Sequence, residues 1–138
     1  MPLKVEDVMV KEVFTIEAES AVNEAVTIMS TREIGCLVVV HNEVPVGIVT
    51  ERDMLKRVLL AAKDPEKTKV SQIMSTPLIS GEPEMSVQAA VTLMSEKKIK
   101  KLPIMEKGCL IGLITLTDLA RSVAYLKHVI SNIAPTVD

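Results

Sequence analysis

The sequence predicts a mixed α/β (α+β) fold made of two β-α-β-β-α repeats that pack through their sheets with pseudo-twofold symmetry. Residues 4–58 recur at residues 69–123 with a constant offset of 65 and no gap, and 17 of the 55 aligned positions are identical. Several other aligned pairs exchange one aliphatic residue for another, as Val8/Ile73, Ile48/Leu113 and Val49/Ile114 do. A repeat of this length is one supersecondary unit used twice. Because each sheet must bury an apolar face, the sheet of the other repeat is the expected cover.

In the first repeat, the spacing of apolar residues changes from strand to helix and back. Residues 21–31 have helical spacing, with Ser20 as the expected N-cap. Cys36–Val40 is a continuous apolar run, which predicts a strand buried on both faces. The remaining expected elements are a strand at Val13–Ile16, a strand at Val46–Val49 and a helix from Thr50 to about Ala62.

The second repeat predicts the same order of elements. These are a strand at Leu78–Ser80, a helix from Ser86 to Lys97, strands at Leu102–Met105 and Leu110–Ile114, and a helix from Thr115 onward. The expected domains are therefore the first repeat at 1–62, a polar linker at 63–69, and the second repeat with a longer last helix at 70–138.

The last helix carries a narrow apolar stripe at spacings of four and three residues. The stripe consists of Leu119, Val123, Leu126, Ile130 and Ile133. It fits packing on the chain's own core or a contact with another subunit, and membrane-surface binding is a third interpretation.

Composition excludes several classes of function. The net charge of −2, with one Phe, one Tyr and no Trp, argues against nucleic-acid binding. No apolar run is long enough for a transmembrane helix and the N-terminus has no signal-peptide core, so we expect a cytoplasmic protein. No Cys and His set typical of a zinc site and no nucleophile–base pair is present, which argues against a metal centre and against an enzyme.

Each repeat ends its last strand with Gly-h-h-Thr-x-x-Asp, where h is aliphatic. The two copies are Gly47–Asp53 and Gly112–Asp118. One interpretation is structural: Thr at the N-cap with Asp three residues on is close to a capping box, and an acid in the first turn suits the helix dipole. Capping alone accounts for both residue types.

The other interpretation of this motif is a nucleotide site. A strand-to-helix turn offers backbone N–H groups to a phosphate, and a carboxylate has two oxygens for the two hydroxyls of a ribose. Thr50 with Asp53, and Thr115 with Asp118, are the candidate pairs. Without aromatic residues to stack on the base, aliphatic side chains are expected to enclose it, and the candidates are Ile16, Leu37, Ile79 and Leu102.

The chain resembles a tandem pair of CBS (cystathionine-β-synthase) domains, known as a Bateman module. The resemblance rests on Asp7-Val8-Met9, on Ala25, Met29 and Ile34, on Leu102-Pro103-Ile104, on the two Gly-h-h-Thr-x-x-Asp motifs, and most of all on Thr50-Glu51-Arg52-Asp53. It implies a regulatory module whose inter-repeat clefts bind AMP, ADP, ATP or S-adenosylmethionine, and a homodimer. Because we expect no second domain to be regulated within this sequence, the regulated partner is expected to be another chain, or the chain is itself the sensor.

The resemblance assigns roles to particular residues. Asp53 and Asp118 are expected to hold ribose, with Thr50 and Thr115 beside them. Lys100 and Lys101, which precede Leu102 and Pro103, are candidates for phosphate contacts, as is Arg52. The lysines also fit an ordinary solvated corner. The first repeat has Gly35-Cys36 where the second has Lys100-Lys101, so the two clefts are not expected to be equivalent.

Two functions remain open at this point. The first is a sensor of adenosine-containing nucleotides. The second is a structural dimerisation module with vestigial, empty clefts. For either function we expect a homodimer formed through the repeat helices, because outward aliphatic positions such as Ile28, Met29, Leu93 and Met94 need cover.

Overall fold

The computed structural model describes residues 3–121, which form two compact units. Within the described chain, unit 1 contains residues 3–12, 80–107 and 111–121. Unit 2 contains residues 13–79 and 108–110. The compact units and the sequence repeats are therefore different sets of residues.

Unit 2 is built around a three-stranded sheet in the order β1-β2-β3. Strand β1 is parallel to β2, and β2 is antiparallel to β3. Its elements in chain order are β1 (Thr15–Glu17), α2 (Val22–Arg32), β2 (Cys36–His41), β3 (Val44–Thr50), α3 (Glu51–Asp53), the π-helix η1 (Met54–Leu59) and the 3₁₀ helix η2 (Val70–Gln72).

Unit 1 contains a two-stranded sheet, β4-β5, together with two short helical segments and one longer helix. Its elements are α1 (Val5–Val8), α4 (Val87–Lys97), β4 (Lys101–Glu106), most of β5 (Cys109–Thr115), and the helical residues 116–121. The predicted fold class, a mixture of helices and strands in two similar repeats, is confirmed.

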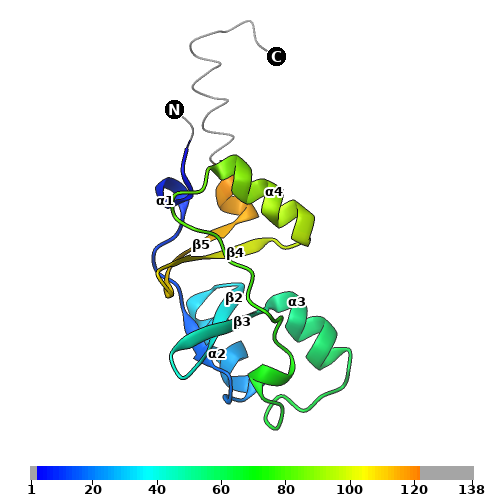
Figure 1. Cartoon of the computed structure of the whole chain (residues 1–138). Coiled ribbons are helices and arrows are strands. Elements are labelled where there is room, and N and C mark those ends of the chain that lie inside the picture. The colour runs from blue at the N-terminus through cyan, green and yellow to red at the C-terminus, as the bar shows by residue number, and fades with distance from the viewer. Residues whose placement is uncertain (1–2, 122–138) are drawn as a thin grey trace, which may run out of the picture. The chain divides into compact units, whose positions relative to one another are not determined.

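Each unit takes its leading segment from the other repeat. Lys4 bridges to Ser86, and Val10 exchanges two backbone hydrogen bonds of 2.9 Å with Leu113. In the same way Lys69 bridges to Ala21, and Ile48 exchanges hydrogen bonds with Ser75. Figure 1 shows this exchange in unit 1 by colour, because the dark blue α1 lies with the green to yellow-orange α4, β4 and β5.

The exchanged segments approach the last strand of each unit so closely that only glycine fits. A Cβ atom on Gly47 would lie 2.7 Å from the Ser75 carbonyl oxygen and 2.8 Å from Met74 Sδ. A Cβ on Gly112 would overlap the Met9 side chain and would lie 3.1 Å from the Val10 carbonyl oxygen, so the Met9 side chain would have to shift. The Gly of both motifs is therefore explained by packing.

The apolar core of unit 2 is aliphatic and draws on the exchanged segment. It contains Ile16, Ala18, Val22, Ala25, Met29, Leu37, Val39, Val49, Val58, Val70 and Ile73. Cys36 and Val38, which alternate with Leu37 and Val39 along β2, are buried as well. The prediction that this strand is buried on both faces is confirmed.

The predicted strand at Leu78–Ser80 is wrong, because the structure has only a single bridge there, between Gly81 and Ile104. In the first repeat, the Val38 N–H donates to Phe14 O just before β1, and the Ala18 N–H just after β1 donates to Val40 O of β2. The equivalent residues of the second repeat are Pro103 and Pro83. Proline has no N–H group, so both of these hydrogen bonds are lost and the strand does not extend.

Ser20 is not the N-cap of α2, as the spacing had predicted, because Ala21 occupies that position and makes no side-chain cap. The first N–H groups of α2 are bound by the linker, since Val22 donates to Thr68 O and Asn23 to Pro65 O, both at 2.8 Å. The backbone carbonyls of the linker therefore accept the hydrogen bonds that an N-cap side chain would otherwise accept. In α4 the equivalent position is Ser86, whose Oγ accepts the Ala89 N–H at 3.0 Å.

The helix after Thr50 is shorter and wider than predicted. It is α-helical for Glu51–Asp53, π-helical to Leu59, and ends in turn residues before Ala62, which has a φ of 56°. Of the predicted apolar stripe, Leu119 is buried, and Val123, Leu126, Ile130 and Ile133 lie outside the described residues.

The exchange of segments predicts which part of the chain folds alone. A chain of residues 13–79 keeps Val70 and Ile73 in the unit 2 core, whereas a chain of residues 1–62 lacks both. Loss of each buried aliphatic side chain costs about 2–5 kcal/mol, against a total stability of about 5–15 kcal/mol for a domain. We expect cooperative thermal unfolding by circular dichroism for 13–79 and none for 1–62. The reverse result would contradict the exchanged core.

Candidate functional site

Thr50 and Asp53 form a complete capping box at the start of α3. Asp53 Oδ2 accepts the Thr50 N–H at 2.8 Å and the Thr50 hydroxyl at 3.1 Å, and the Asp53 N–H donates to Thr50 Oγ1 at 3.3 Å. Asp53 is one of two polar residues among the buried residues of the described chain. The carboxylate is therefore held in one orientation by its own turn. We refer to Thr50, Arg52 and Asp53 as the Asp53 site.

Thr115 and Asp118 repeat this geometry in unit 1. Asp118 Oδ2 accepts the Thr115 N–H at 3.1 Å and the hydroxyl at 3.0 Å, and the Asp118 N–H donates back to Thr115 Oγ1 at 3.1 Å. The structural interpretation of the motif thus holds in both repeats. Any ligand would have to use atoms that the capping box leaves accessible.

The backbone at the start of α3 offers less to a phosphate than the sequence suggested. The Glu51 N–H donates to Gly35 O at 3.1 Å, and the Asp53 N–H is bound by Thr50 Oγ1. Two of the first three N–H groups of the helix are therefore already bonded. A phosphate at this site would depend mainly on side chains.

The second oxygen of Asp53 faces an arginine that sequence analysis missed. Arg57 Nε lies 3.8 Å from Asp53 Oδ1, while Arg57 Nη1 donates to the carbonyl oxygens of Ile73 and Met74, both at 3.0 Å. Arg57 therefore joins the Asp53 site to the exchanged segment. The available signal was its position four residues after Asp53 on a helix.

In unit 1, the predicted lysines lie next to the second capping box. Lys100 O accepts the Leu116 N–H at 3.0 Å, so the start of β4 lies beside the start of the last helix. Lys100 is exposed and Lys101 is half-buried. We refer to Lys100, Lys101, Thr115 and Asp118 as the Asp118 site. Its arginine is Arg121, whose Nη1 is 4.0 Å from Asp118 Oδ1.

The aliphatic residues predicted to enclose a base are mostly core residues. Ile16 and Leu37 belong to the unit 2 core, and Leu102 and its neighbour Pro103 are buried in unit 1. Ile79 is half-buried. By unit, the predicted set divides into Ile16, Leu37, Thr50, Arg52, Asp53 and Ile79 in unit 2, and Lys100, Lys101, Leu102, Pro103, Thr115 and Asp118 in unit 1.

Unit 2 also carries an apolar groove of about 560 Å³ that the sequence did not predict. It runs between α2 and the helix formed by α3 and η1. Its lining residues are Val26, Met29, Ser30, Glu33, Ile34, Glu51, Met54 and Leu55. None of the twelve predicted site residues lines it, although Glu51 lies between Thr50 and Arg52 in the chain.

The described residues contain no helix with the length and apolar character needed to cross a membrane.

The family comparison and several similar proteins identify one family. The CBS domain family matches this chain twice, over residues 5–60 and 70–125. The CBS domain-containing protein YhcV of Bacillus subtilis is 37% identical over 116 residues, which cover 84% of this chain and 82% of YhcV. The chain spans about half the length of the next two relatives, at 51% and 54%.

Two of the relatives are inosine-5'-monophosphate dehydrogenases, but the similarity covers only 24% and 22% of their lengths. The inosine-5'-monophosphate dehydrogenase of Methanocaldococcus jannaschii is 34% identical over 124 residues, which cover 88% of this chain and 24% of the dehydrogenase. The similarity therefore gives no basis for assigning dehydrogenase activity to this chain.

Solved structures agree with the sequence matches. A hexameric CBS-CP12 protein from bloom-forming cyanobacteria superposes with a TM-score of 0.85 at 29% identity, over 92% of this chain and 75% of that protein. The two matched segments, the duplicated capping boxes and this superposition lead to one conclusion: the chain belongs to the CBS domain family and contains two CBS domains.

Proposed function

We propose that this chain is a regulatory module that binds an adenosine-containing ligand, of the class AMP, ADP, ATP or S-adenosylmethionine, and passes its occupancy to a partner protein. One observation supports this most. In both repeats a carboxylate is oriented through Oδ2 by its own capping box, while Oδ1 takes no part in the cap. An oriented carboxylate oxygen is suited to accept a hydrogen bond from a ribose hydroxyl.

The two sites differ in what they offer to a phosphate. The Asp118 site has Lys100 and Lys101 beside the capping box, whereas the Asp53 site has Gly35 and Cys36 at those positions. Arg52, which is exposed, is the corresponding cation of the Asp53 site. Two lysines attract a phosphate more strongly than one exposed arginine. We therefore propose that the Asp118 site takes the more highly phosphorylated ligand.

A structural dimerisation module is the second candidate function. It is favoured by the capping boxes, which explain Thr and Asp without a ligand, and by exposed apolar side chains on the helices. The sequence-based choice of outward residues was partly wrong: Met29 and Met94 are buried because they face the cores. Val26 and Val91, one turn earlier, are each 41% exposed, and Leu55 is 60% exposed. We propose that these residues contact another copy of the chain.

The sensor proposal predicts stabilisation by a ligand. At about 100 times its dissociation constant, a ligand that binds only the folded chain adds about 2.7 kcal/mol to the free energy of unfolding. In a chain of this size each kcal/mol raises the melting temperature by roughly 3–5 °C. We expect such a shift in differential scanning fluorimetry with AMP, ADP, ATP or S-adenosylmethionine, and none with inorganic phosphate or guanosine nucleotides. If protein shown to be ligand-free melts unchanged with all of them, the structural module is the better description.

Replacing the carboxylates separates binding from capping. Asp53→Asn and Asp118→Asn keep one oxygen near the helix start but remove the charge and the second carboxylate oxygen. If these residues hold ribose, the binding free energy measured by titration calorimetry should fall by about 1.5–3 kcal/mol, the range for hydrogen bonds to a charged group. The free energy of unfolding should fall by about 1 kcal/mol or less.

Asp7 provides the matched control. Its Oδ2 accepts the Lys4 N–H at 3.0 Å, which is the same capping contact three residues apart, but it lies outside both candidate sites. Asp7→Asn should therefore lower stability without changing affinity. Ligand affinity that is equal in all three variants and the wild type would leave capping as the only role of the two motif carboxylates.

A further inference from the structure

Arg57 connects the Asp53 site to the exchanged segment of unit 2, which is defined here as residues 70–76. The Arg57 Nη1 group carries two N–H bonds and donates to the carbonyl oxygens of Ile73 and Met74, both at 3.0 Å. Arg57 Nε lies 3.8 Å from Asp53 Oδ1, the carboxylate oxygen that takes no part in the capping box. One planar side chain therefore reaches both the proposed ligand site and the segment.

The exchanged segment also holds the strand that leads into the Asp53 site. The Ser75 N–H donates to Ile48 O at 2.8 Å, and the Ile48 N–H donates back to Ser75 O at 3.1 Å. The Thr76 hydroxyl donates to Val46 O at 3.1 Å. Both acceptor residues belong to β3, whose last residue is Thr50, the N-cap of the capping box. The docked segment therefore supports the site from two sides, through β3 and through the arginine.

The arginine connection is specific to the first repeat. In unit 1, Val10 and Leu113 exchange the equivalent pair of backbone hydrogen bonds, both at 2.9 Å. The offset of 65 places Ser122 at the position of Arg57, and Ser122 lies outside the described residues. A serine hydroxyl has one donor, so it cannot bond two carbonyl oxygens at once. The backbone hydrogen bonds are thus common to both units, and the arginine is an addition in unit 2.

The ion pair between Arg57 and Asp53 is weak by itself. The Arg57 side chain is 50% exposed, and a half-exposed pair at 3.8 Å contributes little to the free energy of unfolding. The Asp53 side chain is only 10% exposed, so its position is set by the groups around it. What the arginine adds is a fixed spacing between this carboxylate and the two carbonyl oxygens of the segment.

We propose that Arg57 is a positioning residue that couples occupancy of the Asp53 site to docking of the exchanged segment. The segment is docked when the hydrogen bonds between Ser75 and Ile48 are formed. When it opens locally, the site loses both of its supports. A ligand that contacts Asp53 Oδ1 therefore binds the docked state more tightly than the open state, and by linkage it stabilises docking. This coupling rests on the proposed function, because it needs a ligand in the Asp53 site.

The exchanged segment is also part of a covalent connection between the units. It follows the linker, whose Pro65 and Thr68 carbonyls bind the first N–H groups of α2, and the chain enters unit 1 at Ser80. A ligand that keeps the segment docked therefore fixes the chain as far as residue 76. The coupling thus gives the Asp53 site a route along the backbone toward the part of the chain that enters unit 1.

Hydrogen exchange followed by NMR measures docking in the absence of a ligand. The Ser75 and Ile48 amides report on unit 2, and the Val10 and Leu113 amides report on unit 1 in the same sample. Arg57→Met should speed exchange of the first pair about tenfold, because two hydrogen bonds from a charged donor are lost. Exchange of the second pair should not change. Equal rates in the wild type and the variant would overturn the role of Arg57.

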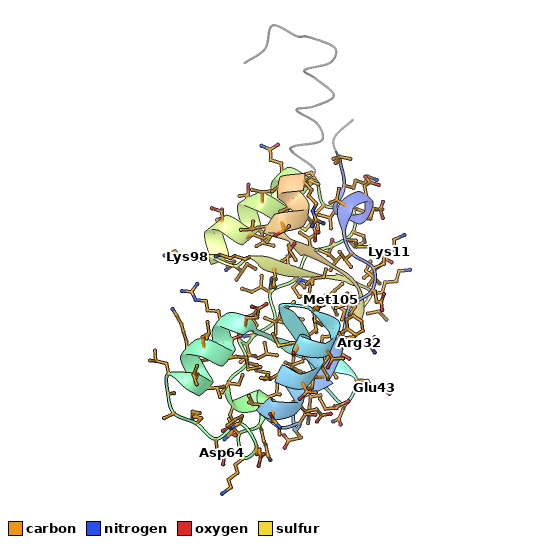
Figure 2. The ribbon with its side chains drawn as sticks, turned by 180° about the vertical axis from the view of Figure 1, so that it is seen from behind. Lys11, Arg32, Glu43, Asp64, Lys98 and Met105 are labelled. Carbon is orange, nitrogen blue, oxygen red and sulfur yellow. The ribbon has the colours of Figure 1, made fainter. Side chains whose placement is uncertain are left out.

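Two variants serve as matched controls. Lys56→Met removes a positive charge from the neighbouring position on η1, and Lys56 takes part in none of the ion pairs of the described residues. Arg32→Met makes the same substitution elsewhere in unit 2. Arg32, labelled in Figure 2 at the end of α2, lies over the Phe14 ring at 5.0 Å from its centroid. Neither control should change exchange at Ser75, and a tenfold change in both would reduce the Arg57 effect to one of charge.

The same amides measured with a nucleotide test the coupling itself. AMP and ATP are used as separate probes, at concentrations that give equal occupancy in each protein by titration calorimetry. In the wild type, the nucleotide that binds should slow exchange at Ser75 and Ile48 about tenfold, within the usual range for coupling between two sites. Arg57→Met should lose most of this slowing. A purely structural arginine would change the rates without ligand but leave the slowing by nucleotide intact.

The outcomes separate this coupling from the proposed function. If neither AMP nor ATP binds, the proposed function and the coupling both fail, and only the ligand-free role of Arg57 remains. If a nucleotide binds and slows exchange equally in the wild type and Arg57→Met, the coupling fails and the proposed function stands. Binding that is lost in Asp118→Asn but unchanged in Asp53→Asn would likewise overturn the coupling alone.

Discussion

Neither repeat forms a complete hydrophobic core from its own residues, and the need for core residues from the other repeat determines much of the fold. Val70 and Ile73 belong to the second repeat in sequence, yet they are buried in the core of unit 2. Val5 of the first repeat is fully buried in unit 1. Burying an aliphatic side chain of this size contributes about 1.5–3 kcal/mol. The exchange therefore makes each unit depend on both repeats.

The exchanged segments also explain residues that resemble a functional motif. Gly47 and Gly112 have no room for a side chain because Met74 and Met9 lie against them. Thr and Asp of the same motif close the capping boxes. Arg57 holds the exchanged segment by donating to Ile73 O and Met74 O. Every residue type in the motif thus has a structural role. A ligand would therefore have to contact atoms outside these structural contacts. In the Asp53 site, the capping box leaves Asp53 Oδ1 and the atoms around it.

Sequence analysis predicted correctly the elements that depend on neighbouring residues. It was wrong where an element depends on hydrogen-bond partners elsewhere in the chain. The spacing of apolar residues predicted α2, α4 and the buried strand β2 within one or two residues. The capping boxes followed from the spacing of Thr and Asp. The strand expected at Leu78–Ser80 was wrong because Pro103 on the neighbouring strand and Pro83 just after the segment cannot donate the hydrogen bonds that Val38 and Ala18 donate in the first repeat. Ser20 failed as an N-cap because distant linker carbonyls already bind the first N–H groups of α2.

The candidate sites were predicted less completely for the same reason. Thr50 and Asp53 are three residues apart, so their association could be inferred from spacing, whereas Lys100 was assigned to the same site as Thr115 only through the family resemblance. Arg57 was missed because its partners are carbonyls in the exchanged segment, which no local pattern shows. The burial of Leu37 and Leu102 depends on how each core closes. Spacing alone does not tell a core leucine from one that lines a cleft.

Differences between the repeats are informative once the shared requirements of the fold are set aside. Positions that the fold needs, such as Gly47 and Gly112 or Asp53 and Asp118, are identical. Three differences gather around the start of the second helix of each unit. They are Gly35-Cys36 against Lys100-Lys101, Glu51-Arg52 against Leu116-Thr117, and Glu33 against Lys98. The backbone at these places is the same in both units, since Glu51 N–H bonds to Gly35 O just as Leu116 N–H bonds to Lys100 O. Because backbone geometry does not require these side chains to differ, the differences are best explained by what each unit contacts.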